Sequence, residues 1–275
     1  MVNTSVVESL KNNLKILHIL SLIIALFVAL VSIISILFKD SFYLTENLIQ
    51  TFVPNDIVNL IIGLPFLLIS LWLTKKGKII GLLCWPGALF YILYIYFLYV
   101  LSVPFNILFL PYLVIFSLTI YTLIGVIASI DQNAIKEHLS ATIPAKVLGG
   151  ILIGLSVLVI IRQIVLIIIA LLGNSTISPQ ELALWIDDFT IGSPAMLIGG
   201  YFLCKKKALG YTIGAGLFIA YGLLSLGLIP FLVIQSHLKN TAIDLFGIVI
   251  LLIMTMICII PFVFFVRAAN KELIH

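Results

Sequence analysis

The sequence contains few charged residues. Only 9% of its 275 residues are Asp, Glu, Lys or Arg, whereas 63% are hydrophobic; an average soluble domain has about 25% charged residues. A soluble domain cannot bury so much apolar surface. Apolar runs of about 20 residues, the length that crosses a hydrocarbon core, follow one another along the chain. The composition therefore excludes a soluble protein and predicts a polytopic protein whose main partner is the lipid bilayer.

The alternation typical of membrane β-strands is also missing. Residues 151–172 are mostly apolar at consecutive positions, whereas strands of a membrane barrel alternate apolar and polar side chains. In lipid, helices are the other structure that satisfies the backbone. The predicted fold class is all-α, with about eight transmembrane helices. The expected spans are residues 14–38, 57–74, 79–102, 107–130, 147–172, 189–204, 208–234 and 245–266.

Catalytic and metal-binding motifs are lacking. The three cysteines and four histidines have neither the spacing of a disulfide framework nor that of a metal site. No G-x-S-x-G elbow, HExxH motif or P-loop occurs. Because membrane-embedded catalysis needs paired acid–base groups or metal ligands, the sequence favours a non-enzyme, and no cofactor is predicted. The net charge of +4 has a topological explanation, so a nucleic-acid partner is not expected.

Lysines and arginines are unevenly divided between the two sides of the predicted spans. Such an excess marks the cytoplasmic side of a membrane protein. Both termini are therefore predicted to be cytoplasmic, in a multi-pass protein of the cell membrane, with loops 39–56 and 173–188 outside. The richer side holds twelve basic residues and the other side two, Lys39 and Lys239; the twelve are Lys11, Lys15, Lys75, Lys76, Lys78, Lys136, Lys146, Lys205, Lys206, Lys207, Arg267 and Lys271.

A set of glycines, prolines and lysines recurs at a constant offset of 129 residues. These residue types have positional meaning, because they break helices, allow close helix approach or mark a cytoplasmic turn. We therefore expect two repeats of four spans, residues 1–139 and 140–275. An even number of spans gives both repeats the same orientation, related by an axis along the membrane normal. The matches are Gly63, Pro65, Lys76, Lys78, Gly81 and Gly87 with Gly192, Pro194, Lys205, Lys207, Gly210 and Gly216.

One stretch of the first repeat resembles known proteins. It contains Trp85-Pro86-Gly87-Ala88-Leu89, then several tyrosines, and then Pro104-Phe105-Asn106. In these residues the second to fourth spans resemble a family of uncharacterised prokaryotic multi-span membrane proteins. The resemblance implies a polytopic helical fold and brings no activity, cofactor or partner with it.

Arg162 is the one ionisable residue that falls clearly within a predicted span. A charge near the bilayer centre costs about 2.5–3.5 kcal/mol. With a rise of about 1.5 Å per residue from Lys146, Arg162 lies about 24 Å into a core of about 30 Å. The same count places Asn59, Tyr94 and Asp188 at about this depth. Four polar side chains from four spans are therefore expected in one layer, in the outer third of the membrane.

We hypothesise that Arg162 pairs with Asp188, with Asp187 as the alternative, and that Asn59, Tyr94 and Gln163 complete the hydrogen bonding. Two functions remain open. The layer could form the floor of an outward-open cavity that binds a small polar or anionic ligand in a transport or permeation protein. Alternatively, the ion pair fixes helix register in a non-catalytic scaffold, sensor or accessory subunit. The absence of carboxylates near the midplane argues against ion-coupled transport.

Two further features favour a packing role. Tyr91, Tyr94, Tyr96 and Tyr99 lie toward the outer end of the third span, where an aromatic belt is the first expectation and a pathway lining the alternative. Gly150 and Gly154 have the GxxxG spacing that lets neighbouring helices approach closely.

Overall fold

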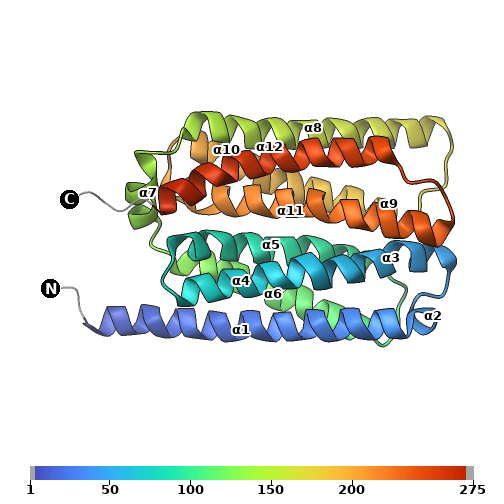
Figure 1. Cartoon of the computed structure of the whole chain (residues 1–275), viewed down its shortest axis with the longest axis horizontal. Helices are drawn as coiled ribbons and strands as arrows, with labels where there is room; N and C mark the ends of the chain where they lie inside the picture. The colour runs from blue at the N-terminus through green and yellow to red at the C-terminus, as the bar shows by residue number, and fades with distance from the viewer. Residues whose placement is uncertain (1–3, 271–275) are drawn as a thin grey trace.

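The computed structural model describes residues 4–270, with side chains from residue 14 onward. The structure is 87% helical and contains no strand within the described residues, so the prediction of an all-α fold is confirmed. The long helices lie side by side in one bundle (Figure 1). Seven helical segments are long and apolar enough to cross a membrane. The fold is that of a helical membrane protein.

The first half of the chain contains six helices and one π-helical turn. The segments α3, η1 and α4 join into one continuous helix from Glu46 to Lys75. The π-helical turn ends two residues before Pro65, which has no N–H to continue the regular helical hydrogen bonding. The elements are α1 (Thr4–Leu37), α2 (Lys39–Phe42), α3 (Glu46–Val58), η1 (Asn59–Gly63), α4 (Leu64–Lys75), α5 (Ile79–Ser102) and α6 (Phe109–Ser129).

The second half follows the same order after a short helix, α7. Its π-helical turn, η2, also directly precedes a proline-containing first turn, at Pro194. The side chain of Ser178 caps α9 and forms the capping box with Glu181 that the spacing predicts. The elements are α7 (Gln132–Ser140), α8 (Ala145–Leu172), α9 (Pro179–Asp187), η2 (Asp188–Gly192), α10 (Ser193–Cys204), α11 (Ala208–Lys239) and α12 (Leu245–Ala269).

One of the eight predicted spans is not among the seven apolar segments. The predicted span at residues 189–204 belongs to the continuous helix α9–η2–α10, which is not among the seven. Its adjacent aspartates and its glycines make it less apolar than the others. The predicted boundary at residue 57 is also wrong, because that helix begins at Glu46, where Thr45 caps it by accepting a hydrogen bond from the Leu48 N–H.

The α4–α5 turn and the α10–α11 turn share their backbone hydrogen bonds. The Lys76 N–H donates to the Trp72 carbonyl (3.1 Å), and 129 residues later the Lys205 N–H donates to the Tyr201 carbonyl (3.0 Å). In each turn the lysine ammonium also lies over the aromatic ring of its hydrogen-bond partner, 3.7 Å from the centroid in the first turn and 5.8 Å in the second. The two hairpins therefore close in the same way.

The same turns also place left-handed residues at equivalent positions. Gly77 has φ +71° and Lys206 has φ +52°. One helical turn further on, a Cβ added to Gly81 or to Gly210 would lie 2.3 Å from a backbone nitrogen of the preceding helix. Glycine is required at both places because the two helices of each hairpin are in backbone contact.

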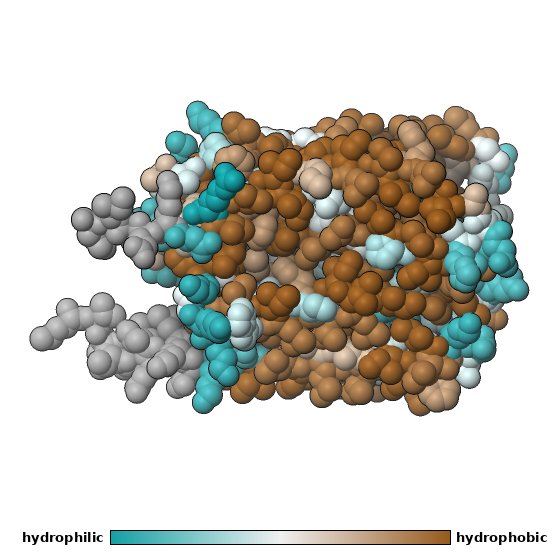
Figure 2. Space-filling model, in the orientation of Figure 1, coloured by the Kyte–Doolittle hydropathy of each residue, from teal (hydrophilic) through white to brown (hydrophobic). Residues whose placement is uncertain are grey.

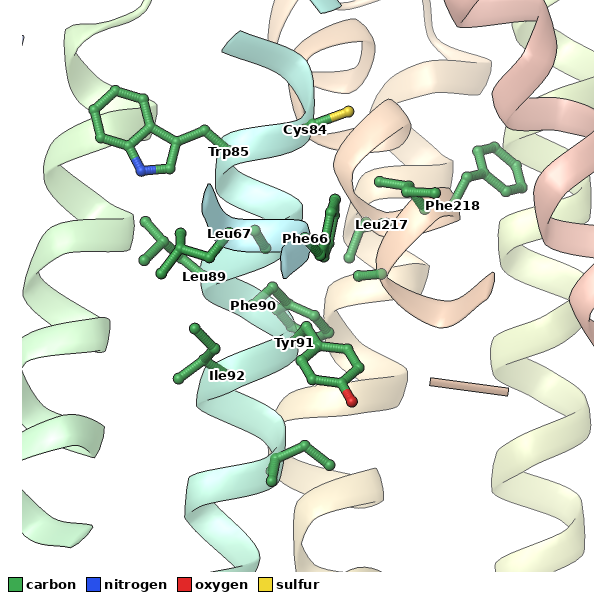
Figure 3. Packing of buried hydrophobic residues seen from close by; sticks show 14 of the residues in the cluster. Phe66, Leu67, Cys84, Trp85, Leu89, Phe90, Tyr91, Ile92, Leu217 and Phe218 are labelled. Atoms are coloured by element: carbon green, nitrogen blue, oxygen red, sulfur yellow. The ribbon is translucent and has the colours of Figure 1, made fainter. Parts of the chain in front are cut away.

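Helix α5 is the most buried of the seven apolar segments. Figure 3 shows Leu89 and Phe90 of α5 beside side chains of α4 and α11, whereas Trp85 points away from α11. α5 and α11 meet at Gly87 and Gly216, where a Cβ on Gly87 would lie 2.4 Å from the Gly216 carbonyl oxygen. These two glycines are 129 residues apart in the sequence. The centre of the bundle is therefore a glycine-to-glycine contact between helices of the two halves.

The GxxxG spacing in α8 does not have the predicted role. A Cβ added to Gly150 or Gly154 would meet no atom within 4 Å, so these residues face open space. The neighbouring Gly149 makes the close contact instead, because its Cβ would lie 2.5 Å from the Gly200 carbonyl oxygen of α10.

On the face shown in Figure 2, an apolar band lies between two more polar ends. At one end lie the lysine turns described above, α7, the start of α1 and the end of α12 (Figure 1). We call this the lysine-rich end. The polar side chains predicted to form a layer lie toward the other end.

Candidate functional site

Asp188 is the first residue of the π-helical turn η2, and other helices donate hydrogen bonds to both of its carboxylate oxygens. The Tyr94 hydroxyl of α5 donates to Oδ1 at 2.8 Å. The Gln163 amide of α8 donates to Oδ2. A Cβ on Gly192 would lie 3.3 Å from Asp188 Oδ1 and 3.1 Å from the Tyr221 hydroxyl of α11, so Tyr221 also adjoins this site. We call Tyr94, Gln163, Asp187, Asp188 and Tyr221 the Asp188 cluster.

The Asp188 cluster contains polar atoms that have no partner. Asp187 is fully buried, and neither of its carboxylate oxygens has a hydrogen-bond partner among the described residues. The same holds for the Gln163 amide oxygen and the Tyr221 hydroxyl. Nearly all buried polar groups in proteins are hydrogen-bonded. The cluster therefore has the capacity to accept a further donor or a cation.

The predicted ion pair between Arg162 and Asp188 is wrong. Arg162 is exposed on the surface of α8, and no lysine or arginine nitrogen lies within 4.0 Å of the Asp187 or Asp188 carboxylates among the described side chains. The reason is helical geometry, since consecutive residues point about 100° apart. Gln163 faces the interior and is fully buried, whereas Arg162, on the adjacent position around α8, faces outward.

The other predicted residues divide into two groups. Tyr94, Gln163 and Asp188 are brought together by hydrogen bonds, and Asp187 is the adjacent residue on the same helix. Asn59 is buried in η1, at the position equivalent to Asp188, and its amide nitrogen has no partner among the described residues. Among the residues that the structure describes, no hydrogen bond connects Asn59 to the Asp188 cluster.

The tyrosines of α5 do not form a belt at the surface. Tyr91, Tyr96 and Tyr99 are each 1% exposed, and Tyr94 is half-buried. Tyr96, Tyr99 and Tyr112 pack against one another, with ring centroids 5.0 to 6.1 Å apart. The expectation of an aromatic belt is therefore wrong for these side chains, which contribute hydroxyl groups to the interior.

A buried carboxyl group outside the Asp188 cluster was not predicted. Asp56 of α3 is fully buried, although the sequence interpretation placed it at the edge of an external loop. The Tyr43 hydroxyl donates to its Oδ2 at 2.7 Å, and the Tyr99 hydroxyl donates to its Oδ1 at 2.9 Å. One sequence signal could have revealed it: Asp56 lies three residues before Asn59, on the same helical face.

Further hydroxyl groups surround Asp56. Ser32 lies beside Asp56 and Tyr96, and Ser35 lies beside Tyr43 and Tyr112. All are buried. We call this group the Asp56 cluster, and its members are Ser32, Ser35, Tyr43, Asp56, Tyr96, Tyr99 and Tyr112.

Helix α5 connects the two clusters. Tyr94 donates toward η2 of the second half, whereas Tyr99 donates toward α3 of the first half. Asp188 lies 17 residues before Lys205, and Asp56 lies 19 residues before Lys75, which corresponds to about 25 and 28 Å along a helix. Both clusters are therefore at similar depth, toward the end opposite the lysine-rich end.

Two surface hollows lie elsewhere. One is at the end of α11, near His237 and Thr241. The other is an apolar groove of about 620 Å³ between α8 and α12, lined by residues such as Ile151, Met256 and Phe264. Neither is lined by a member of the two clusters.

Comparison with protein-family models, with curated proteins and with solved structures found no match for this chain. The functional argument therefore rests on the chemistry of the two clusters.

Proposed function

We propose that the protein crosses the cell membrane eight times, with both termini in the cytoplasm. The seven apolar segments and the helix from Pro179 to Cys204 supply the eight crossings. That last helix has the same order of elements, helix, π-turn and helix, as Glu46–Lys75. The start of α1 and the end of α12 share the lysine-rich end (Figure 1), which the positive-inside rule assigns to the cytoplasm.

The proposed architecture consists of two like-oriented units of four helices, residues 1–139 and 140–275. The matching hydrogen bonds of the two lysine turns support this division, as do the π-turns η1 and η2, which begin and end 129 residues apart. The contact between Gly87 and Gly216 joins equivalent positions. A twofold axis through that contact, along the membrane normal, accounts for all three observations.

The proposed function is to bind a small cationic solute at the Asp188 cluster and to let it permeate the membrane. The observation that carries this proposal is Asp187, a fully buried carboxyl group with no partner, adjacent to Asp188. An uncompensated charge in an apolar interior is costly, and intramembrane ionisable residues mark ligand pathways. A cationic ligand would supply the missing donors and the missing charge.

The exposure of Arg162 changes the kind of ligand proposed. The sequence favoured a small polar or anionic ligand because a buried arginine was expected at the site. With Arg162 exposed on α8, the lining consists of two carboxyl groups, an amide and two tyrosine hydroxyls. This lining attracts a cation and repels an anion.

A scaffold or accessory subunit is the second candidate. It is favoured by the fact that Tyr94 and Gln163 satisfy both oxygens of Asp188 within the fold. A cluster of this kind can fix helix register without any ligand. Uptake measurements distinguish the two candidates, because a scaffold has no solute flux.

The test uses proteoliposomes containing the full chain and radiolabelled guanidinium, a permanently charged cation that carboxylates bind through two parallel hydrogen bonds. We expect uptake well above that of protein-free liposomes, and its loss in Asp188→Asn. Arg162→Met is the control and should transport as the wild type does. Uptake equal to that of empty liposomes in the wild type would favour the scaffold, and loss of uptake in Arg162→Met would restore the arginine-centred hypothesis.

A further inference from the structure

The Asp56 cluster has hydroxyl groups that its own fold does not use. The Oγ atoms of Ser32 and Ser35 and the hydroxyls of Tyr96 and Tyr112 have no hydrogen-bond partner among the described residues. The two serines are 0% exposed and the two tyrosines 1% exposed. Ser32 lies beside Asp56 and Tyr96, and Ser35 beside Tyr43 and Tyr112, but none of the four hydroxyls completes a regular hydrogen bond. An occupant that binds their oxygens would satisfy them, and a buried polar atom without a partner costs about 1–3 kcal/mol.

Ser32 and Ser35 differ from two other buried serines, which satisfy their own helices: Ser21 donates to the Leu17 carbonyl at 2.9 Å, and Ser70 donates to the Phe66 carbonyl at 2.7 Å. Ser32 and Ser35 make no such bond. They are three residues apart and so lie on one face of α1, which is the face that adjoins Asp56 and Tyr43. Their oxygen lone pairs are therefore available to the cluster.

The chemistry of the oxygens selects a class of ligand. Hydroxyl and carboxylate oxygens are hard ligands that suit alkali and alkaline-earth cations. No group of three or more His, Cys, Asp or Glu residues occurs among the described residues, which argues against a transition metal. Asp56 is the one carboxyl group of the cluster, so a single positive charge balances it, whereas a divalent ion would leave excess charge in an apolar interior.

We propose that the Asp56 cluster is a binding site for a dehydrated monovalent alkali cation, with Na⁺ as the probe ion. Asp56 supplies the charge, Ser32 and Ser35 supply oxygens from α1, and Tyr96 and Tyr112 supply oxygens from α5 and α6. The Tyr43 and Tyr99 hydroxyls orient the carboxylate by donating to it. The ion holds together helices of the first half only, and this site does not depend on the function proposed for the Asp188 cluster.

The experiment follows thermal unfolding of the purified full chain in detergent as NaCl replaces N-methyl-D-glucamine chloride at constant ionic strength. A ligand that binds only the folded protein raises its Tm in a saturable way. We expect a rise of about 3 °C at saturation. In the double variant Ser32→Ala with Ser35→Ala, the apparent Kd for Na⁺ should weaken at least tenfold. Ser70→Ala is the matched control and should keep the Na⁺ response.

Tyr112→Phe is a second variant that should fold normally, because the hydroxyl it removes has no partner, and it should also weaken Na⁺ binding. Asp188→Asn should leave the Na⁺ response unchanged. The proposal is overturned if Na⁺ and N-methyl-D-glucamine give the same Tm, as expected for a cluster filled by water. It is also overturned if the serine variant keeps the wild-type Kd, or if the response disappears in Asp188→Asn.

Discussion

The two halves of the protein each bury carboxyl groups at similar depth, but they satisfy them in opposite ways. In the first half, both oxygens of Asp56 accept hydrogen bonds from tyrosines, and the surrounding hydroxyls are the atoms without partners. In the second half, Asp188 has its donors while the whole carboxylate of Asp187 has none. The first cluster offers spare hydroxyl oxygens, and the second offers a spare carboxyl group.

This difference suggests that similar helical frames can carry different chemistry. A set of spare hydroxyls around an oriented carboxylate fits a bare ion held in place. A spare carboxylate beside a half-buried tyrosine fits a solute that brings its own donors. The glycines and prolines that set the helix arrangement recur at an offset of 129 residues. Asp56 and Asp187, in contrast, have no acidic counterpart 129 residues away.

The largest expected difference between the clusters is in stability. Asp56→Leu should lower the free energy of unfolding by about 3 kcal/mol, because it leaves the Tyr43 and Tyr99 hydroxyls buried without an acceptor. Asp187→Leu should be neutral or stabilising, because no hydrogen bond is lost and a buried charge is removed. Thermal unfolding in detergent measures both. Equal destabilisation by the two variants would mean that the clusters do not differ as described.

Substitution at the Gly87–Gly216 contact in the centre of the bundle should lower the stability almost as much. Gly87→Ala places a methyl group against the backbone of Gly216 and should cost about 1–3 kcal/mol through overpacking. Both clusters include α5 side chains, so guanidinium uptake and the Na⁺ response should fall together. Gly150→Ala is the matched control, since its Cβ meets open space. If the two alanine variants had the same Tm, the close approach of α5 and α11 would be refuted.

A smaller difference in stability is expected between substitutions of two tyrosines of α5. Tyr99→Phe removes a donor to Asp56 and should cost about 1–2 kcal/mol. Tyr96→Phe removes a hydroxyl with no partner in the described structure and should be close to neutral without Na⁺. The comparison is made by Tm in Na⁺-free buffer. A larger loss in Tyr96→Phe than in Tyr99→Phe would reverse the roles assigned to these two side chains.

The smallest effect is expected at Arg162. Arg162→Met should change the free energy of unfolding by less than about 0.5 kcal/mol, because the side chain is exposed and forms no ion pair. Urea-dependent or thermal unfolding in detergent is sufficient to measure it. A loss of several kcal/mol would indicate a buried partner for Arg162.

The sequence predicted the helical fold better than it predicted the candidate site. The all-α fold and the lysine turns could be predicted because apolar length, glycine, proline and lysine each have a direct physical meaning in a membrane. The depth count brought Tyr94 and Asp188 to one level, and these two are hydrogen-bonded, with Gln163 as the second donor to Asp188. Depth alone does not give the direction in which a side chain points, and this is why Arg162 was placed inside.

Asp56 and the α5 tyrosines were missed for a related reason. The predicted span began at residue 57, one residue after Asp56, because a charge was taken as the end of an apolar run. Tyrosines near a helix end are common at the membrane surface, and their orientation depends on which helices surround α5. That information is tertiary and does not appear in the local sequence.

The most direct test of the central claim is equilibrium binding of radiolabelled guanidinium to the purified protein, with Asp187→Asn compared with the wild type. If Asp187 supplies the spare charge of the Asp188 cluster, the Kd should weaken at least tenfold in Asp187→Asn and remain unchanged in the Ser32→Ala, Ser35→Ala double variant. Binding that is equally tight in Asp187→Asn and in the wild type would contradict the account.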